Sequence, residues 1–231
     1  MKPKYIKGAG YIGLLLCSLF SVMLVVLLEL SNRASFREIL SFMASEPRIV
    51  ALNIIIAVSL TGFIYILVRK VWLSSFLALL LSTLMGFVNM SKFKYQGVPF
   101  LPWDIFLIQD AARVMPAMKN EFLDSKSIAF LGLAAILLLI VVAFYLFWDK
   151  KVNLKYNSNK LLGAVSSILV ITMFSSVLIG FSSENKYRAD FFRTNGITNY
   201  FWDQNQNYAY NGFLLGFTMN ISNIIIKKPE G

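Results

Sequence analysis

The stretch Tyr95-Gln-Gly-Val-Pro-Phe-Leu-Pro-Trp-Asp104 interrupts a chain that is otherwise built from long apolar runs. It places one glycine and two prolines among three aromatic residues. Glycine and proline set turns in the backbone, so this composition indicates a stiff, turning segment rather than a mobile linker. The stretch therefore predicts an ordered structure that lies on a membrane, with the apolar runs arranged around it.

The residues that follow Pro102 predict a helix that continues to about Met115. Apolar residues recur there at helical spacing, and polar residues gather on the opposite side. The apolar set is Leu101, Ile105, Ile108, Ala112 and Met115, with Leu107, Ala111 and Val114 alongside, and the polar set is Gln109, Asp110 and Arg113. A helix of this kind lies in the membrane interface with its apolar face toward the lipid.

Asp104 does not share the polar side of this helix, and two interpretations of it stay open. In the structural interpretation, its carboxylate lies in the first turn after Pro102, accepts free backbone N–H groups and meets the positive end of the helix dipole. In the functional interpretation, Asp104 and Trp103 face a polar lipid headgroup or a partner domain.

The composition is typical of a multi-span membrane protein. The 231 residues are 57% hydrophobic and 15% charged, and the mean hydropathy is +0.64, which is far too apolar for a soluble domain. The net charge of +10 comes from Lys and Arg at the ends of apolar runs, so it indicates membrane topology and not nucleic-acid binding.

Two residue types that often build active sites are nearly absent. The chain has no His, and its single Cys, Cys17, lies within the first apolar run. An intrachain disulfide, His-based catalysis and a Cys/His metal site are therefore excluded. We predict no catalytic residue, no metal ligand and no cofactor in this chain.

Five apolar runs are long enough to cross a hydrocarbon core of about 30 Å. They cover about residues 11–30, 49–68, 71–90, 127–148 and 161–181. The first follows three lysines, as a signal peptide would, but no clean cleavage site follows it, so we expect an uncleaved span. The predicted fold is an all-α polytopic membrane protein with amphipathic interfacial helices: a five-span domain (1–181) with an outer loop (91–126), then a tail (182–231) with its own amphipathic helix.

Basic residues predict the orientation of these spans. With the N-terminus in the cytoplasm, the inner segments hold nine of the 22 Lys and Arg residues in a small part of the sequence outside the spans. They are Lys2, Lys4, Lys7, Arg69, Lys70, Lys150, Lys151, Lys155 and Lys160. An odd number of spans then puts the loop 91–126 and the tail on the same extracytoplasmic face of the cell membrane.

Three polar residues lie within the predicted spans. Glu29 is at the outer end of its span, where we expect the carboxylate to reach water, and Asn53 and Asn89 are expected to bond neighbouring helices. A transport pathway normally needs more charge inside the membrane than these residues supply.

The tail predicts an amphipathic helix within residues 204–226. One side of it carries Tyr210, Phe213, Leu214, Phe217, Ile221, Ile224 and Ile225. Gly212 and Gly216 lie on another side, where a second helix or domain could approach closely. A sixth span is the alternative, but several asparagines between 205 and 223 would be costly to leave in lipid.

Two of these segments resemble a known family. Lys94-Tyr-Gln-Gly-Val-Pro-Phe-Leu-Pro-Trp-Asp104 is similar to the K-x-R-G-x-P-x-x-P-x-D loop of the lipoteichoic acid synthase-like phosphoglycerol transferases, with Gln96 in place of the basic residue. Tyr210-Asn-Gly-Phe213 and Lys228-Pro-Glu-Gly231 are similar to the segment that precedes their catalytic domain. The resemblance implies five spans, followed by an extracellular sulfatase-like domain that holds a divalent metal and a threonine nucleophile. The catalytic domain is not part of this sequence.

The resemblance implies a membrane module that anchors this catalytic domain and presents a lipid, such as phosphatidylglycerol or a glycolipid, to it. Two alternatives stay open: a self-contained small transporter or flippase, and an assembly partner of a separate envelope enzyme. The candidate contacts to a lipid headgroup or a domain are Lys94, Pro99, Trp103, Asp104, Arg113, Arg188, Tyr210, Asn211, Gly212 and Gly216, and Lys92 is a further candidate for phosphate.

Overall fold

The computed structural model of the chain describes residues 9–33, 35–68, 70–107, 124–146, 170–177, 180 and 186–221. The secondary structure in these ranges is helical, which confirms the predicted all-α class for the described part of the chain. Two predicted elements lie largely outside these ranges. They are the loop helix, of which the part after Leu107 is not described, and the span expected at 161–181.

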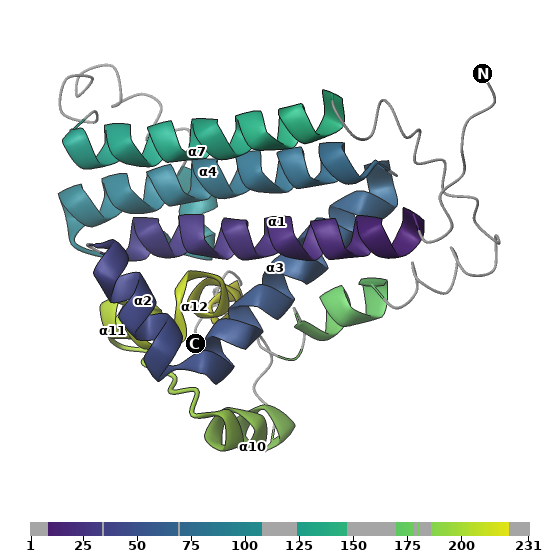
Figure 1. Cartoon of the computed structure of the whole chain (residues 1–231). Coiled ribbons are helices and arrows are strands. Elements are labelled where there is room, and N and C mark those ends of the chain that lie inside the picture. The colour runs from purple at the N-terminus through teal and green to yellow at the C-terminus, as the bar shows by residue number, and fades with distance from the viewer. Residues whose placement is uncertain are drawn as a thin grey trace, which may run out of the picture.

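Four long helices form the bundle that carries the rest of the structure. They are α1 (Ala9–Asn32), α3 (Pro47–Val68), α4 (Val71–Gln96) and α7 (Ser125–Phe144). In Figure 1, α1, α4 and α7 run side by side while α3 crosses them obliquely. Gly86 of α4 faces α7 so closely that a Cβ there would lie 2.5 Å from the ring of Phe130, so a residue without a side chain is needed for this packing.

Among the described residues, three helices are long and apolar enough to cross a membrane: α3, α4 and α7. A fourth span results if Ser18–Asn32 of α1 and α2 (Phe36–Ser45) are counted as one, although the two are bent by 117°. The described residues therefore fit an all-α multi-pass membrane protein with three or four spans. They do not give the five that the sequence predicts, and the five-span count stays a prediction.

Two segments outside the predicted spans differ from expectation. The helix expected to end at Met90 continues to Gln96, and Gly97 ends it in the left-handed conformation with φ 70°. The short helix α2 begins at the N-cap Ser35, which accepts the Glu38 N–H, and it buries Ile39 and Phe42. Helix α2 was not predicted from the sequence, because its ten residues are too few to stand out beside the spans.

The tail is also built differently from the prediction. It contains α10 (Lys186–Asn195), α11 (Gln204–Asn211) and α12 (Phe213–Met219). The single helix expected within residues 204–226 is wrong, because the chain breaks at Gly212, which has φ 76° and ψ 170°. Residues 222–226 of that prediction lie outside the described part of the chain.

Candidate functional site: a tail segment docked into the bundle

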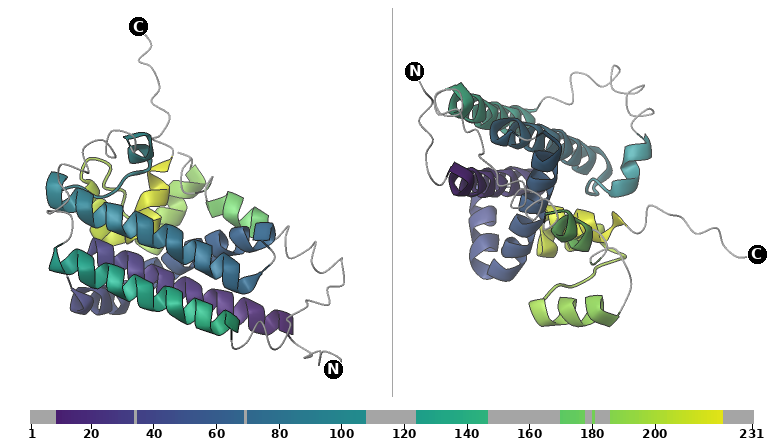
Figure 2. Two further views of the ribbon diagram at one scale, coloured as in Figure 1. Left: turned by 90° about the horizontal axis from the view of Figure 1, so that it is seen from above. Right: turned by 90° about the vertical axis from the view of Figure 1, so that its right-hand side faces the viewer.

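The C-terminal helices α11 and α12 lie against one end of the bundle. At this end α1 and α4 finish and α3 and α7 begin, and we call it the tail-bearing end. Figures 1 and 2 show α11 and α12, in yellow, on the side of α1 that faces away from α7, and α12 contacts both α1 and α3. Its residues Phe213, Leu214, Leu215, Gly216 and Met219 are buried, so it is an internal element and not an interfacial one.

Glu29 of α1 holds the first turn of α12. One carboxylate oxygen accepts the Phe213 N–H at 2.7 Å, and the other accepts from Arg33 Nε at 3.0 Å. Arg33 also donates to the Ala209 carbonyl at 2.8 Å, so the ion pair joins both tail helices to α1. The expectation that Glu29 reaches water is wrong: it is 1% exposed, because the free N–H at the start of α12 and the guanidinium together replace its hydration.

Asn53 of α3 makes the matching contacts from the other side. Its Oδ1 accepts the Leu215 N–H at 3.0 Å, and its Nδ2 donates to the Asn211 carbonyl at 2.8 Å. The prediction that Asn53 bonds a neighbouring helix is confirmed, and that helix is the tail. With Glu29, it satisfies the backbone groups that the break at Gly212 would otherwise leave unpaired inside the protein.

Gly212 is a point of close approach between the tail and the bundle. A Cβ at this position would lie 2.7 Å from Glu29 Oε1 and 2.8 Å from Asn53 Nδ2. Its backbone angles also fall in a region that only glycine adopts at low cost. At Gly216 a Cβ would lie 3.0 Å from the ring of Tyr208, which belongs to α11. The close approach on this side of the tail therefore involves the bundle at Gly212 and a helix of the tail itself at Gly216.

The loop after α4 joins the same structure. Phe100 donates its N–H to Asn89 Oδ1 at 2.8 Å, and its carbonyl accepts from the Tyr208 hydroxyl at 2.8 Å. Asn205 also donates to the Gly97 carbonyl at 2.8 Å. Asn89 in turn donates to the Ser31 carbonyl of α1 at 3.0 Å, which confirms that it bonds a neighbouring helix. One continuous set of hydrogen bonds therefore links α1, α4, the loop and the tail.

Burial gives Tyr208 an altered acidity. The phenol is 1% exposed, and this burial, with a smaller effect from the Asp104 charge, raises its pKa well above 10.0. The neutral hydroxyl is thereby kept as the donor to the loop.

Asp104 has a structural role in the loop. It lies in the short 3-10 helix η1 (Pro102–Leu107), where its carboxylate accepts the Leu101 N–H at 2.7 Å and pairs with Lys92. The structural interpretation of Asp104 is therefore the one that these contacts support, although the accepted N–H precedes Pro102 rather than following it. Lys92 was a candidate for contacting a phosphate, but its side chain is only 12% exposed and forms this ion pair within the protein.

Lys94, another candidate, makes an ion pair with Asp124 at 3.4 Å, and both side chains are 40% exposed. Asp124 is the N-cap of α7, and the Ser127 backbone N–H that it accepts lowers the pKa of its carboxyl, with Lys94 acting in the same direction. Lys94 thus ties the end of α4 to the start of α7.

The remaining candidates do not form a single cluster. Pro99 is buried, and Trp103 is partly buried against the core cluster that includes Phe100 and Tyr208. Tyr210 is 55% exposed and stacks on Tyr200 with ring centroids 5.2 Å apart. Arg188 lies on α10 and lines a separate groove, and Arg113 lies outside the described residues.

Several residues of this hydrogen-bond network were not predicted from the sequence. Asn32 donates to the Tyr208 carbonyl at 2.9 Å, and Asn207 accepts from Asn211 Nδ2 at 2.8 Å. Apart from Asn211, which was a candidate contact residue, the asparagines of the tail were considered as evidence against a sixth span. The number of asparagines in the tail, together with Glu29 and Asn53 in the spans, indicates that the tail and the spans form hydrogen bonds with each other.

The polar side chains that bond the tail serve to hold it in position. Among the described residues, no three His, Cys, Asp or Glu side chains converge as a metal site would require. Amide side chains that bond backbone groups fix a segment in place, but they do not activate a nucleophile. No family model, curated protein or solved structure matches the chain, so the likeness to lipoteichoic acid synthase-like transferases depends on the two motifs quoted above.

Proposed function

We propose that this chain is the membrane module of a cell-envelope phosphoglycerol transferase of the lipoteichoic acid synthase-like class. It anchors a sulfatase-like catalytic domain, which carries the divalent metal, and presents a lipid substrate to it. The observation that supports this role best is the docked tail: Glu29, Arg33 and Asn53 bond its backbone at Ala209, Asn211, Phe213 and Leu215. A domain joined after this segment would extend from a fixed point on the bundle.

The proposal includes five spans, with the N-terminus in the cytoplasm and the tail outside. Two exposed positions test this orientation, Trp202 in the tail and Lys70 between α3 and α4. In intact cells, with Cys17 replaced by Ser, a membrane-impermeant thiol reagent should label Trp202→Cys and leave Lys70→Cys unlabelled. The opposite pattern would place the tail in the cytoplasm and exclude an extracytoplasmic catalytic domain.

The function itself is tested in the cells that produce the chain. Deletion of its gene should lower the amount of phosphoglycerol polymer in the cell envelope, and the wild-type gene should restore it. Reading the DNA downstream of the Gly231 codon should reveal a reading frame for a sulfatase-like domain. Unchanged polymer after deletion would overturn the proposal, and polymer loss with the catalytic domain encoded by a separate gene would make the chain an assembly partner.

A self-contained lipid transporter is the competing function. The contacts of Glu29 argue against a transporter. Both of its carboxylate oxygens are bonded within the protein, and Arg33 is the ion-pair partner of Glu29. The purified chain in liposomes should therefore not accelerate the movement of fluorescent phospholipids between leaflets. Rapid movement that depends on the chain would favour the transporter.

A further inference from the structure

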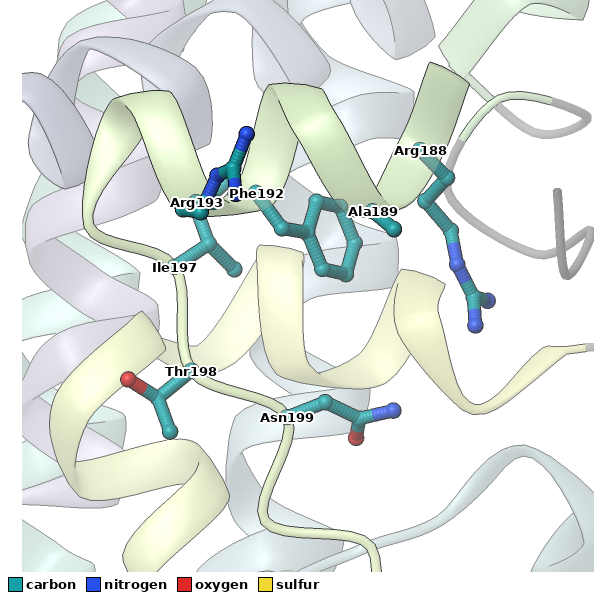
Figure 3. A pocket seen from close by; sticks show the side chains of 7 residues that line it. All are labelled: Arg188, Ala189, Phe192, Arg193, Ile197, Thr198 and Asn199. Atoms are coloured by element: carbon teal, nitrogen blue, oxygen red, sulfur yellow. The ribbon is translucent and has the colours of Figure 1, made fainter. Parts of the chain in front are cut away.

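A groove lies beside α10, away from the hydrogen bonds that dock the tail. It has a volume of about 460 Å³ and is lined by Arg188, Ala189, Phe192, Arg193, Ile197, Thr198 and Asn199. Phe192 and Ile197 are 7% and 5% exposed and give the groove an apolar floor. In Figure 3, Arg188 and Asn199 extend toward the same opening, whereas the Arg193 guanidinium points away from it.

Arg188 is held in a definite position at this groove. It is partly buried, and its guanidinium carbon lies 5.4 Å from the centroid of the Phe192 ring. A guanidinium within cation–π distance of an aromatic ring is attracted to that position, and its planar fork of N–H groups suits two oxygens of one phosphate. The amide of Asn199 adds a neutral hydrogen-bonding group on the other side of the opening.

The charge of α10 favours an anionic ligand. Its described residues include Lys186, Arg188 and Arg193 against one carboxylate, Asp190, which pairs with Arg193 at 3.4 Å. Arg48 at the start of α3 adds a further positive charge beside the helix, because it donates to the Thr194 carbonyl at 3.4 Å. A positive surface of this kind attracts the negative phosphates of a membrane.

The surroundings favour a lipid over a soluble phosphate. The contact with Arg48 places α10 at the tail-bearing end of α3, and Phe191, Phe201 and Trp202 nearby are 42%, 46% and 95% exposed. Exposed aromatic side chains are typical of the boundary between membrane and water. An apolar floor beneath a guanidinium matches the junction between the phosphate and the acyl chains of a phospholipid.

We propose that this groove binds the phosphate of an anionic phospholipid and so holds α10 against the bilayer surface. Arg188 bonds the phosphate oxygens, Asn199 bonds the polar headgroup, and Phe192 and Ile197 contact the start of an acyl chain. This lipid is an anchor and not a substrate, so the inference goes beyond the proposed transferase role and holds for any function of the chain.

Lipid retention tests the proposal without any enzymatic assay. The full-length chain is placed in nanodiscs that contain equal amounts of phosphatidylglycerol and phosphatidylcholine. Native mass spectrometry then measures which lipid stays bound to the chain when it is released. The wild type should retain phosphatidylglycerol in preference to phosphatidylcholine. Arg188→Ala should weaken this retention about tenfold, the expected loss of a charge-assisted pair of hydrogen bonds, and Arg188→Lys should weaken it less.

Arg37→Ala is the matched control, because it removes the same charge from the exposed surface of α2, outside the groove. It should change retention less than about twofold, as expected of a solvent-screened surface charge. Equal loss in both variants, or equal retention of the two lipids by the wild type, would overturn the proposal. Competition by soluble glycerol 3-phosphate as effective as that by phosphatidylglycerol would also overturn it, in favour of a soluble-phosphate site.

Discussion

The spans and the docked tail satisfy their buried polar groups in opposite ways. Within the spans, buried hydroxyls mostly bond the carbonyl one turn earlier in their own helix, as Ser59, Thr61 and Ser82 do. In the docked tail, backbone groups of residues 208–215 are bonded by side chains from α1, from Arg33 directly after it, and from α3. A span is therefore self-sufficient in lipid, whereas the tail depends on partners that are distant in sequence.

This difference explains why polar side chains occur where they do in the apolar helices. A continuous helix pairs its own N–H and C=O groups, so it needs no help inside a membrane. The break at Gly212 leaves N–H groups of α12 without intrahelical partners, and Glu29 and Asn53 lie at the two positions from which side chains reach them. The polar residues of the spans thus mark the place where a second segment enters.

The strongest way to break this arrangement is to remove the carboxylate of Glu29. Glu29→Ala deprives the Phe213 N–H of its acceptor and leaves Arg33, 11% exposed, without its ion-pair partner. Breaking a buried pair from one side costs about 3–5 kcal/mol. We expect a loss of that size in the free energy of unfolding, measured in mixed detergent by tryptophan fluorescence, together with faster proteolysis within residues 204–219.

Glu29→Gln is the control, because it keeps an oxygen that can accept the Phe213 N–H and removes only the charge. It should be less destabilised than Glu29→Ala and should stay resistant to protease in the tail. If Glu29→Ala lost no more than the roughly 0.5 kcal/mol of an ordinary surface substitution, the carboxylate would not be what docks the tail.

Two glycines with positive φ provide a sharper comparison. Gly212 has φ 76° and a Cβ there would meet Glu29 and Asn53, whereas Gly97 has φ 70° with no atom within 4 Å of a Cβ. Gly97→Ala should cost only the backbone strain, about 1–2 kcal/mol. Gly212→Ala should cost more, since strain of about 1–3 kcal/mol adds to the displacement of Glu29.

The same unfolding measurement compares the two glycine variants directly. Protease resistance of the tail should be lost in Gly212→Ala and kept in Gly97→Ala. Equal destabilisation of the two would mean that the close contact with the bundle contributes nothing beyond the backbone conformation.

The sequence predicted the parts of the fold that depend on local composition. Apolar length located α3, α4 and α7, with α3 and α7 beginning two residues before the predicted starts of 49 and 127. Asn53 and Asn89 were correctly expected to bond other segments, because an amide in lipid needs a partner. These inferences require only the nearest residues and the properties of the bilayer.

The errors arise where the partner is far away in the chain. Glu29 was expected to reach water, but its acceptor role depends on Phe213, 184 positions later. Lys92 was assigned to the loop, whereas α4 continues through it and its partner is Asp104. The break at Gly212 was missed because helical periodicity extends across it, while the contacts of α12 with α1 and α3 involve residues far away in the sequence.

The smallest predicted effect concerns the contact between the loop and the tail. Tyr208→Phe keeps the buried ring and removes only the hydroxyl that donates to the Phe100 carbonyl at 2.8 Å. A hydrogen bond of this kind contributes about 1 kcal/mol. We expect a loss of that size near neutral pH, with the bundle and the docked tail intact, because Glu29 and Asn53 still bond α12.

The pH dependence separates the lost hydrogen bond from a simple change in packing. Burial raises the pKa of Tyr208 in the folded protein, so the stabilisation is complete below the ordinary value of 10.0 and is lost as the pH rises above it. The unfolded phenol ionises there while the folded one stays neutral. The wild type should therefore lose more stability than Tyr208→Phe between about pH 8 and about pH 11, and the difference between them should shrink. A constant difference over this range would show that Tyr208 is not held as a neutral donor and that the ring alone joins the loop to the tail.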